Sequence, residues 1–147
     1  MSDRFPLRPD AGWYNTMRTR YGDAVPAIEH LQIRRGLQSV IGDMYAQLHD
    51  LDLLRHVDIV SIVTRNAGFT VIDARFHEGL FEDDRIALDF AFEHHSERLN
   101  AACEHCGRPG SVIAKTGLEA LLDDPYAVLG DRLLCTGCYE SWSGRDV

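Results

Sequence analysis

The stretch VDIVSIVTRNAGFTVIDARF, residues 57–76, decides the fold class of this 147-residue chain. Its density of β-branched residues predicts two strands, and Asn66 and Gly68 tolerate the positive φ that a short hairpin turn requires. Strict alternation divides the apolar residues of the first strand between its faces, with Val57, Ile59 and Val63 beside Ser61 on one and Val60 and Ile62 on the other. A strand that is apolar on both faces is typical of the inside of a sheet or the underside of a helix.

Helices are predicted on both sides of this hairpin. Within residues 27–51, six apolar residues recur at helical spacing, which places them on one face: Leu37, Val40, Ile41, Met44, Tyr45 and Leu48. The polar residues, Arg34 and Arg35 among them, fall mostly on the opposite, solvated face. A second long helix is predicted over 83–102, where two aspartates suit the positive end of the helix dipole. Its core stripe is Leu88, Phe92, His95, Leu99 and Ala102, beside Ile86, Phe90 and Ala91.

The N-terminal part is less regular. Residues 1–12 carry prolines and glycine and predict an irregular arm, and WYNTMRTRYG, residues 13–22, predicts a short helix that Gly22 ends. Its aromatic residues either close the core or anchor a partner, and we favour the core: Phe5, Trp13, Tyr14 and Tyr21. Together these elements predict an α+β domain over residues 1–100, in which two main helices cover a short antiparallel sheet.

All four cysteines lie in two close pairs, Cys103-x-x-Cys106 and Cys135-x-x-Cys138. Such pairs form tight turns whose sulfurs point at one ion, so the two pairs predict a tetrahedral four-thiolate Zn²⁺ site. A disulfide is disfavoured in the reducing compartment that we expect, and a redox dithiol would open a helix, whereas Cys103 and Cys106 end one. Four cysteine ligands leave no position for water, so this single zinc ion should be structural.

The segment between the two pairs completes a predicted zinc module over residues 101–147, attached by the second helix without a flexible linker. SVIA, residues 111–114, and DRLL, residues 131–134, could pair as a hairpin, with an insertion at 116–130 whose first part has helical composition. YESW, residues 139–142, could form one helical turn. This order predicts a treble clef, with a zinc ribbon as the alternative.

Read together, the strand pair, the helix and the motifs CEHCGRPG (103–110) and LLCTGC (133–138) resemble a class of small bacterial and phage proteins known mainly from sequence. In that class a strand pair around Gly-Leu-Arg precedes a helix that ends in Cys-x-x-Cys-Gly-x-Pro-Gly, and a Leu-Cys-x-x-Cys motif follows. The matching positions are Cys103, Cys106, Gly107, Pro109, Gly110, Leu134, Cys135 and Cys138. The hairpin sequence and the long insertion depart from the pattern. The resemblance implies a bacterial or phage setting and the metal, and it implies no activity.

Charge and hydropathy limit the partners. The chain has 15 Lys and Arg against 23 Asp and Glu, a formal charge of -8, which disfavours general attraction to phosphate backbones or anionic membranes. No window approaches the roughly 18 consecutive apolar residues of a membrane helix, and the N-terminus lacks the apolar run of a signal peptide. We therefore expect a cytoplasmic protein with no membrane contact.

Histidines form the densest polar cluster outside the cysteines. RFHEG (75–79) and EHHSE (93–97) supply His77, Glu78, His94 and His95 as candidates for a second metal site or an acid/base pair. Adjacent histidines on a helix point about 100° apart, so His94 and His95 do not easily face one ion. We favour solvated or core-edge histidines, and no other motif supports an enzyme.

An acidic run on the second long helix is the candidate partner surface. It consists of Asp83, Asp84, Asp89, Glu93 and Glu97. The simplest interpretation is a solvated helix face, and the sharper one is a patch that occupies a basic site on a bacterial toxin or nuclease, as an inhibitor or immunity-type protein would. The alternative is a nucleic-acid-binding or regulatory zinc protein. It would need basic residues to converge on one face: Arg18, Arg20, Arg34, Arg35, Arg108, Lys115 and Arg132.

Overall fold

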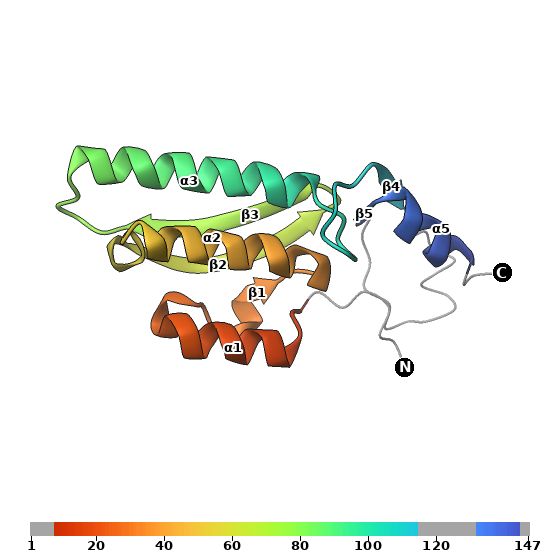
Figure 1. Cartoon of the computed structure of the whole chain (residues 1–147), viewed down its shortest axis with the longest axis horizontal. Helices are drawn as coiled ribbons and strands as arrows, with labels where there is room; N and C mark the ends of the chain where they lie inside the picture. The colour runs from red at the N-terminus through yellow and green to blue at the C-terminus, as the bar shows by residue number, and fades with distance from the viewer. Residues whose placement is uncertain (1–7, 115–131, 145–147) are drawn as a thin grey trace.

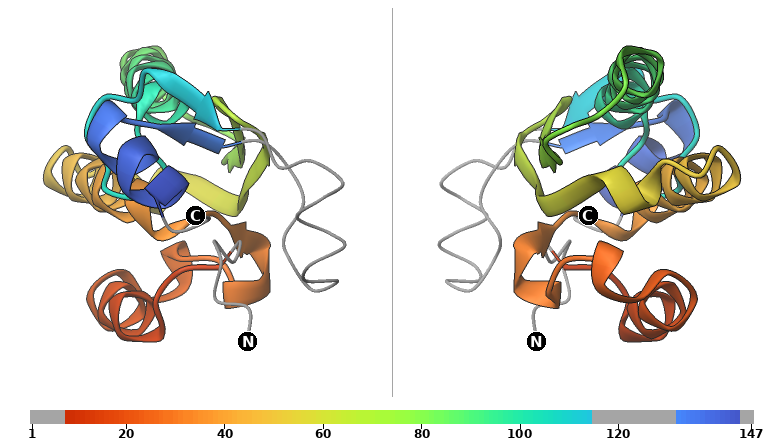
Figure 2. Two further views of the ribbon diagram at one scale, coloured as in Figure 1. Left: turned by 90° about the vertical axis from the view of Figure 1, so that its right-hand side faces the viewer. Right: turned by 90° about the vertical axis from the view of Figure 1, so that its left-hand side faces the viewer.

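The computed structural model describes residues 8–114 and 132–144. Figure 1 shows the elements in chain order, which are α1 (Ala11–Tyr21), β1 (Leu31–Gln32), α2 (Gln38–Asp50), β2 (Val57–Asn66), β3 (Phe69–Phe76), α3 (Glu82–Ala101), β4 (Val112–Ala114), β5 (Arg132–Leu134) and α5 (Thr136–Gly144). The three helices α1, α2 and α3 form one layer against one face of the sheet (Figure 2). The fold is therefore α+β, as predicted, with a C-terminal segment that carries the cysteines.

The main sheet is mixed, whereas a wholly antiparallel sheet was predicted. Strands β2 and β3 pair antiparallel, with Val57 opposite Phe76, but β1 runs parallel to β2, with Leu31 opposite Ile62. The helix predicted from residue 27 begins only at Gln38. Two 3-10 turns, Ile28–His30 and Arg35–Leu37, precede it. The chain between them is extended, with Leu31 and Ile33, two residues apart, both buried. A strand of two residues carries no periodicity that a sequence could reveal.

A bulge in β2 overturns the predicted division of its faces. The register pairs Ile59 with Ala74 and Ser61 with Asp73, which leaves Val60 as the extra residue. Because of it, Ile59 and Ile62 both point into the core, and Val63 is only half-buried. The hairpin turn itself lies where the sequence predicted it, with Gly68 at a φ of 67°.

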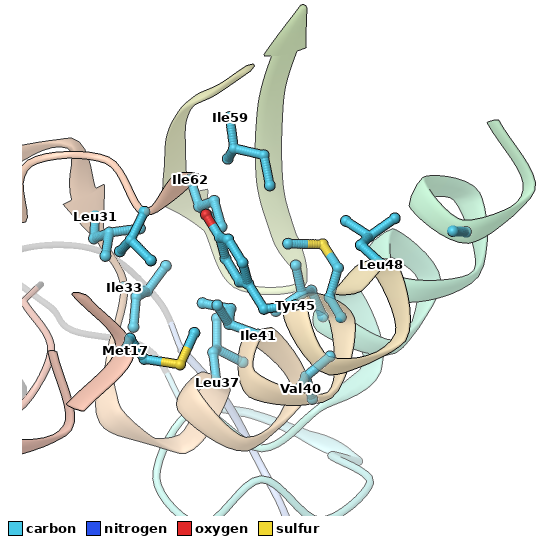
Figure 3. Close-up of a cluster of buried hydrophobic side chains, with 14 of the residues drawn as sticks. Met17, Leu31, Ile33, Leu37, Val40, Ile41, Tyr45, Leu48, Ile59 and Ile62 are labelled. Carbon is cyan, nitrogen blue, oxygen red and sulfur yellow. The ribbon is translucent and has the colours of Figure 1, made fainter. Parts of the chain in front are cut away.

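The core lies between the helices and the sheet (Figure 3). All six residues assigned to the buried face are at most 2% exposed, five of them in α2 and Leu37 in the turn just before it, which confirms that prediction. Tyr45 is among them: its hydroxyl donates to the Ala24 carbonyl at 2.8 Å, and burial raises its pKa. The α1 aromatics Trp13, Tyr14 and Tyr21 pack half-buried against this core, and Phe5 lies outside the described residues.

Helix α3 buries a narrower stripe than the sequence predicted. Leu88, His95 and Leu99 are buried together with Ala91, but Ile86 and Phe90 are 59% and 71% exposed. At about 100° per residue, these two side chains point roughly 160–200° away from Leu88. They were assigned to the core because they are apolar, although their angular position turns them to solvent.

The C-terminal segment contains the predicted hairpin. Strands β4 and β5 pair antiparallel, with Val112 opposite Leu134, and the helix that follows, α5, is longer than the single turn predicted. The insertion at 116–130 and its helix prediction lie outside the described residues, as does most of the predicted N-terminal arm.

Candidate metal centre

The chain brings all four cysteines together from two places. Cys103 follows the end of α3, and Cys106 lies in the tight turn after it, which closes as the Gly107 amide donates to the Cys103 carbonyl at 2.9 Å. Cys135 follows β5, and Cys138 lies in the first turn of α5. Each pair therefore occupies a turn between two regular elements, and the β4–β5 hairpin sets the distance between the pairs.

The sulfur positions fit one tetrahedral ion. The four Sγ atoms all lie within 4.8 Å of one another, and those of Cys106 and Cys135 are 3.6 Å apart. A Zn–S bond of about 2.3 Å in a tetrahedron requires sulfurs roughly 3.8 Å apart. A disulfide requires about 2.05 Å, and all four cysteines are free thiols. The arrangement thus matches a four-thiolate metal site.

Local hydrogen bonds favour the thiolate form of Cys135. The Cys138 backbone amide and then its thiol lower the pKa of Cys135 to about 7, and the His105 amide donates to Cys103 Sγ at 3.4 Å. Burial, followed by the neighbouring thiols, raises the pKa of Cys138. A cation that binds here must displace the remaining thiol protons, so its affinity should fall as pH falls.

The first cysteine turn is docked on the main domain through Gly36. The Gly36 amide donates to the Glu104 carbonyl at 3.0 Å, and a Cβ at position 36 would collide with the Glu104 backbone. Gly107 approaches from the other side, at a φ of 86°, and a Cβ there would lie 2.8 Å from the Gly36 oxygen. Both glycines are needed because two backbones pass at contact distance.

A buried ion pair reinforces the same junction. Arg34 Nη1 lies 2.6 Å from Glu104 Oε1, and both side chains are 3% exposed. The other carboxylate oxygen accepts from the Leu133 amide at 2.7 Å, and the Glu104 amide donates to the Leu133 carbonyl at 2.8 Å. Glu104 therefore joins the cysteine turn to both the main domain and β5.

This pair was not predicted from the sequence, and Arg34 was expected on a solvated helix face. Arg34 instead precedes the helix, in the extended segment after β1, and its partner is 70 residues away. No local spacing signals such a contact. The clue that sequence offers is the position of Glu104 inside a cysteine turn, where a carboxylate must be paired if it is buried.

The histidine candidates do not converge. His77 Nε2 lies 3.2 Å from Asp58 Oδ2, at the end of the hairpin. His95 is buried between α2 and α3, where its Nε2 lies 2.6 Å from Gln47 Oε1. Burial, followed by the positive neighbours His94 and Arg98, lowers the pKa of His95 to about 4. Within the described residues, the cysteines form the one cluster arranged to hold a metal.

The acidic residues of α3 lie mostly on its outer surface. Asp83, Asp89, Glu93 and Glu97 are exposed. Asp84 differs, because it is less exposed and its Oδ2 lies 3.8 Å from His56 Nε2. The four exposed carboxylates surround the apolar side chains that the sequence had assigned to the core.

Three of the seven basic residues proposed for nucleic acid are buried or engaged elsewhere, whereas Arg20, Arg35 and Arg108 are exposed. Arg34 and Arg132 are buried, and Lys115 lies outside the described residues. Arg18 donates to the Val25 carbonyl at 2.7 Å and lies 3.7 Å from Asp23.

Comparisons with known proteins yield no family model, curated protein or solved structure that matches the chain. None of the described helices is long and apolar enough to cross a membrane.

Proposed function

We propose that this protein is a non-enzymatic binding module, stabilised by one structural Zn²⁺ ion, whose target is another, basic protein. The observation that carries the proposal is the outer face of α3. There Ile86 and Phe90 are 59% and 71% exposed, among the carboxylates of Asp83, Asp89, Glu93 and Glu97. Phe81, just before the helix, is 80% exposed.

Large exposed apolar side chains grouped on one helix are typical of interaction surfaces. Phenylalanine supplies contact area at the centre of such a surface, and the charged rim selects the partner. A carboxylate rim on a chain of net charge -8 favours a partner with a basic site. Inhibition of a basic nuclease or toxin is the role that fits this chemistry, since an acidic apolar face can occupy a cleft shaped for phosphate.

The zinc site supports the fold in this proposal. Cys103, Cys106, Cys135 and Cys138 fill all four positions of a tetrahedral ion, so they leave none for a reacting water. The order of a cysteine turn, the β4–β5 hairpin, a second cysteine pair and α5 is that of a treble clef. The ion then fixes the C-terminal segment against the main domain.

Affinity capture from the host with the zinc-loaded chain tests the function. We expect a stoichiometric protein partner with the wild type, and its loss with the Ile86→Ser and Phe90→Ser double variant. Leu51→Ser is the matched control, because Leu51 is 53% exposed and lies just beyond α2. The complex should weaken as salt screens the carboxylates.

Recovery of no stoichiometric protein, or equal recovery with the double variant, would contradict the proposal. A mobility shift with DNA or RNA that weakens steeply with salt would favour the nucleic-acid alternative instead.

A further inference from the structure

The outer edge of β3 is open. The sheet order is β1-β2-β3, so β3 is its last strand, and no strand of the described residues pairs with its other side. We propose that an extended segment of the partner protein adds to the sheet along this edge, in the groove between β3 and α3. The inference rests on the proposed function, because it specifies how the partner engages the α3 surface.

The backbone of β3 offers hydrogen bonds at this edge. The Thr70 amide donates to Asn100 Oδ1 at 2.6 Å, so it points away from β2. The facing hydroxyls of Thr64 and Thr70 are 2.9 Å apart, as expected of a non-hydrogen-bonded pair. The register continues unbroken to the pair Ile62 and Ile72, and therefore the N–H and C=O groups of Ile72 also point outward.

Ala74 repeats this orientation two residues further along. The bulge near it belongs to β2, where Val60 is the extra residue, and β3 keeps its own alternation. Ile72 and Ala74 thus present two amides and two carbonyls to the open edge. At Thr70, the first outward-facing residue, the Asn100 side chain already accepts the amide hydrogen bond. Its oxygen takes the place that a backbone carbonyl of an added strand would otherwise occupy.

A groove of about 400 Å³ lies beside this edge. Its floor is apolar, with Ile72, Ala74 and Phe76 from β3 and Phe92 from α3, and its helix wall carries Glu93 and Ser96. The rings of Phe76 and Phe92 stack at 5.9 Å, which gives the groove a firm base. A strand paired here would point every second side chain into the groove, as in other cases where a peptide extends a sheet beside a helix.

The chemistry of the groove specifies its occupant. Alternate apolar side chains would contact Ile72 and Phe76, and a Lys or Arg would reach Glu93, which lines the groove and belongs to the acidic surface of α3. This charge complementarity indicates an extended apolar segment of a basic protein. The same segment could continue over Phe90 on the outer face of α3.

A second copy of the chain is a poorer occupant. Two β3 strands paired antiparallel would lie about 4.8 Å apart, with both α3 helices on the same face of the joined sheet. Asn100 shows that α3 reaches over the outer edge of β3. The Asn100 side chains would therefore compete with the second β3 strand for the outward-facing Thr70 amides.

Selection from a displayed library of random ten-residue peptides, with the zinc-loaded full chain as bait, tests the inference. We expect enriched peptides to alternate apolar residues and to carry Lys or Arg. Ala74→Pro should weaken their binding roughly tenfold, because it removes an edge donor and obstructs pairing. Ala74→Ser, which keeps the amide, should leave the affinity within about twofold.

If Ala74→Pro fails to fold, amide hydrogen exchange of the wild-type chain with bound peptide provides the test instead. Bound peptide should slow exchange at Ile72 and Ala74 in the wild type. The inference is overturned if no peptide is enriched, if peptides leave both amides unprotected, or if a folded Ala74→Pro variant binds them normally. Protection of these amides in the chain alone, rising with its concentration, would assign the edge to a second copy and also overturn it.

The two proposals fail separately. A captured protein that is lost with Ile86→Ser and Phe90→Ser but retained with Ala74→Pro supports the proposed function and refutes the added strand. Loss of capture with both variants, but not with Ala74→Ser, supports both.

Discussion

The main domain and the cysteine segment are held together by different forces. The main domain buries a continuous apolar core contributed by α1, α2, α3 and the sheet. The second cluster consists of Cys103 and Leu134, with Cys135, Cys138 and Tyr139 packed against them. Within the described part of this segment, so little apolar area contributes only weakly against the entropy of ordering a hairpin and a helix. We therefore expect the cysteine segment to depend on the proposed metal ion and on its junction with the domain.

The junction is polar and sterically tight where the domain core is apolar. Gly36 and Arg34 hold Glu104 by its backbone and its side chain. The small cysteine segment is thus fixed to the larger domain by its first cysteine turn, through Glu104 and the close approach of Gly107 to Gly36. Loss of the metal should then also destabilise residues of the main domain at this junction.

Removal of the metal ligands should have the largest effect. Elemental analysis of the wild type should find about one zinc ion per chain, and Cys103→Ser with Cys135→Ser should abolish it. Structural zinc sites contribute on the order of 10 kcal/mol to folding, so the cysteine segment should unfold. Hydrogen exchange should also accelerate around Gly36. A wild-type chain with two disulfides and no metal would refute the site.

Breaking the buried ion pair should come next. Glu104→Ala leaves Arg34 buried without its carboxylate and should cost about 3–5 kcal/mol in urea unfolding. Arg55→Ala is the control: Arg55 pairs with Asp52 at 3.0 Å, but on the surface, and its loss should cost less than about 1 kcal/mol. Equal effects of the two variants would contradict the assigned role of Glu104.

Two glycine substitutions sharpen the contrast further. Gly36→Ala places a methyl group against the Glu104 backbone and should destabilise the protein by about 1–3 kcal/mol. Gly42→Ala, inside α2, meets nothing within 4 Å and should stabilise it by up to about 1 kcal/mol. Thermal unfolding of the two variants in zinc buffer shows whether Gly36→Ala lowers the melting temperature and Gly42→Ala raises it. A neutral Gly36→Ala would mean that the cysteine turn can move away from the domain.

The smallest effect concerns pH and the domain core. The pKa of His95 is about 4 in the folded chain against an ordinary 6.5, so the unfolded chain binds more protons between these values. Stability from this group is complete above about pH 6.5 and declines as pH falls toward 4, at no more than about 1.4 kcal/mol per pH unit.

The imidazole NMR shifts of His95 should report a neutral ring until the pH approaches 4. In the His95→Phe variant, the decline of the unfolding free energy between pH 6.5 and 4 that is due to His95 should disappear. The decline that is due to zinc release should remain. Protonation of His95 near pH 6.5 without loss of structure would contradict its burial against Gln47.

Local periodicity predicted the parts of the fold that depend on neighbours in sequence. The α2 face, the hairpin turn and the β4–β5 pair were all predicted correctly, because each follows from spacing or turn chemistry. The parallel strand β1 and the bulge at Val60 were not, since two residues show no period and a bulge leaves no signature in this run of valines and isoleucines. Position on the helix, read by angle, would have identified Ile86 and Phe90 as exposed.

The candidate site likewise contains one part that local spacing predicted and one part that it did not. The spacing of four cysteines in two pairs predicted which thiols would lie together, and the structure places these four in one cluster. The contact between Arg34 and Glu104 was not predictable, because it joins two segments that only the complete fold brings together. The acidic residues were found by composition, and the apolar residues among them were missed because hydrophobicity was equated with burial.

The bond between Asn100 and Thr70 has a consequence for the behaviour of the protein at high concentration. An open strand edge is a template for unlimited growth between identical molecules, and many proteins protect such edges to avoid aggregation. Here α3 overhangs the edge, and its Asn100 side chain engages the terminal donor of the strand. The helix that shapes the groove thus also opposes edge-to-edge pairing of β3 between identical molecules, so an edge open to one slender chain is protected against fibril growth.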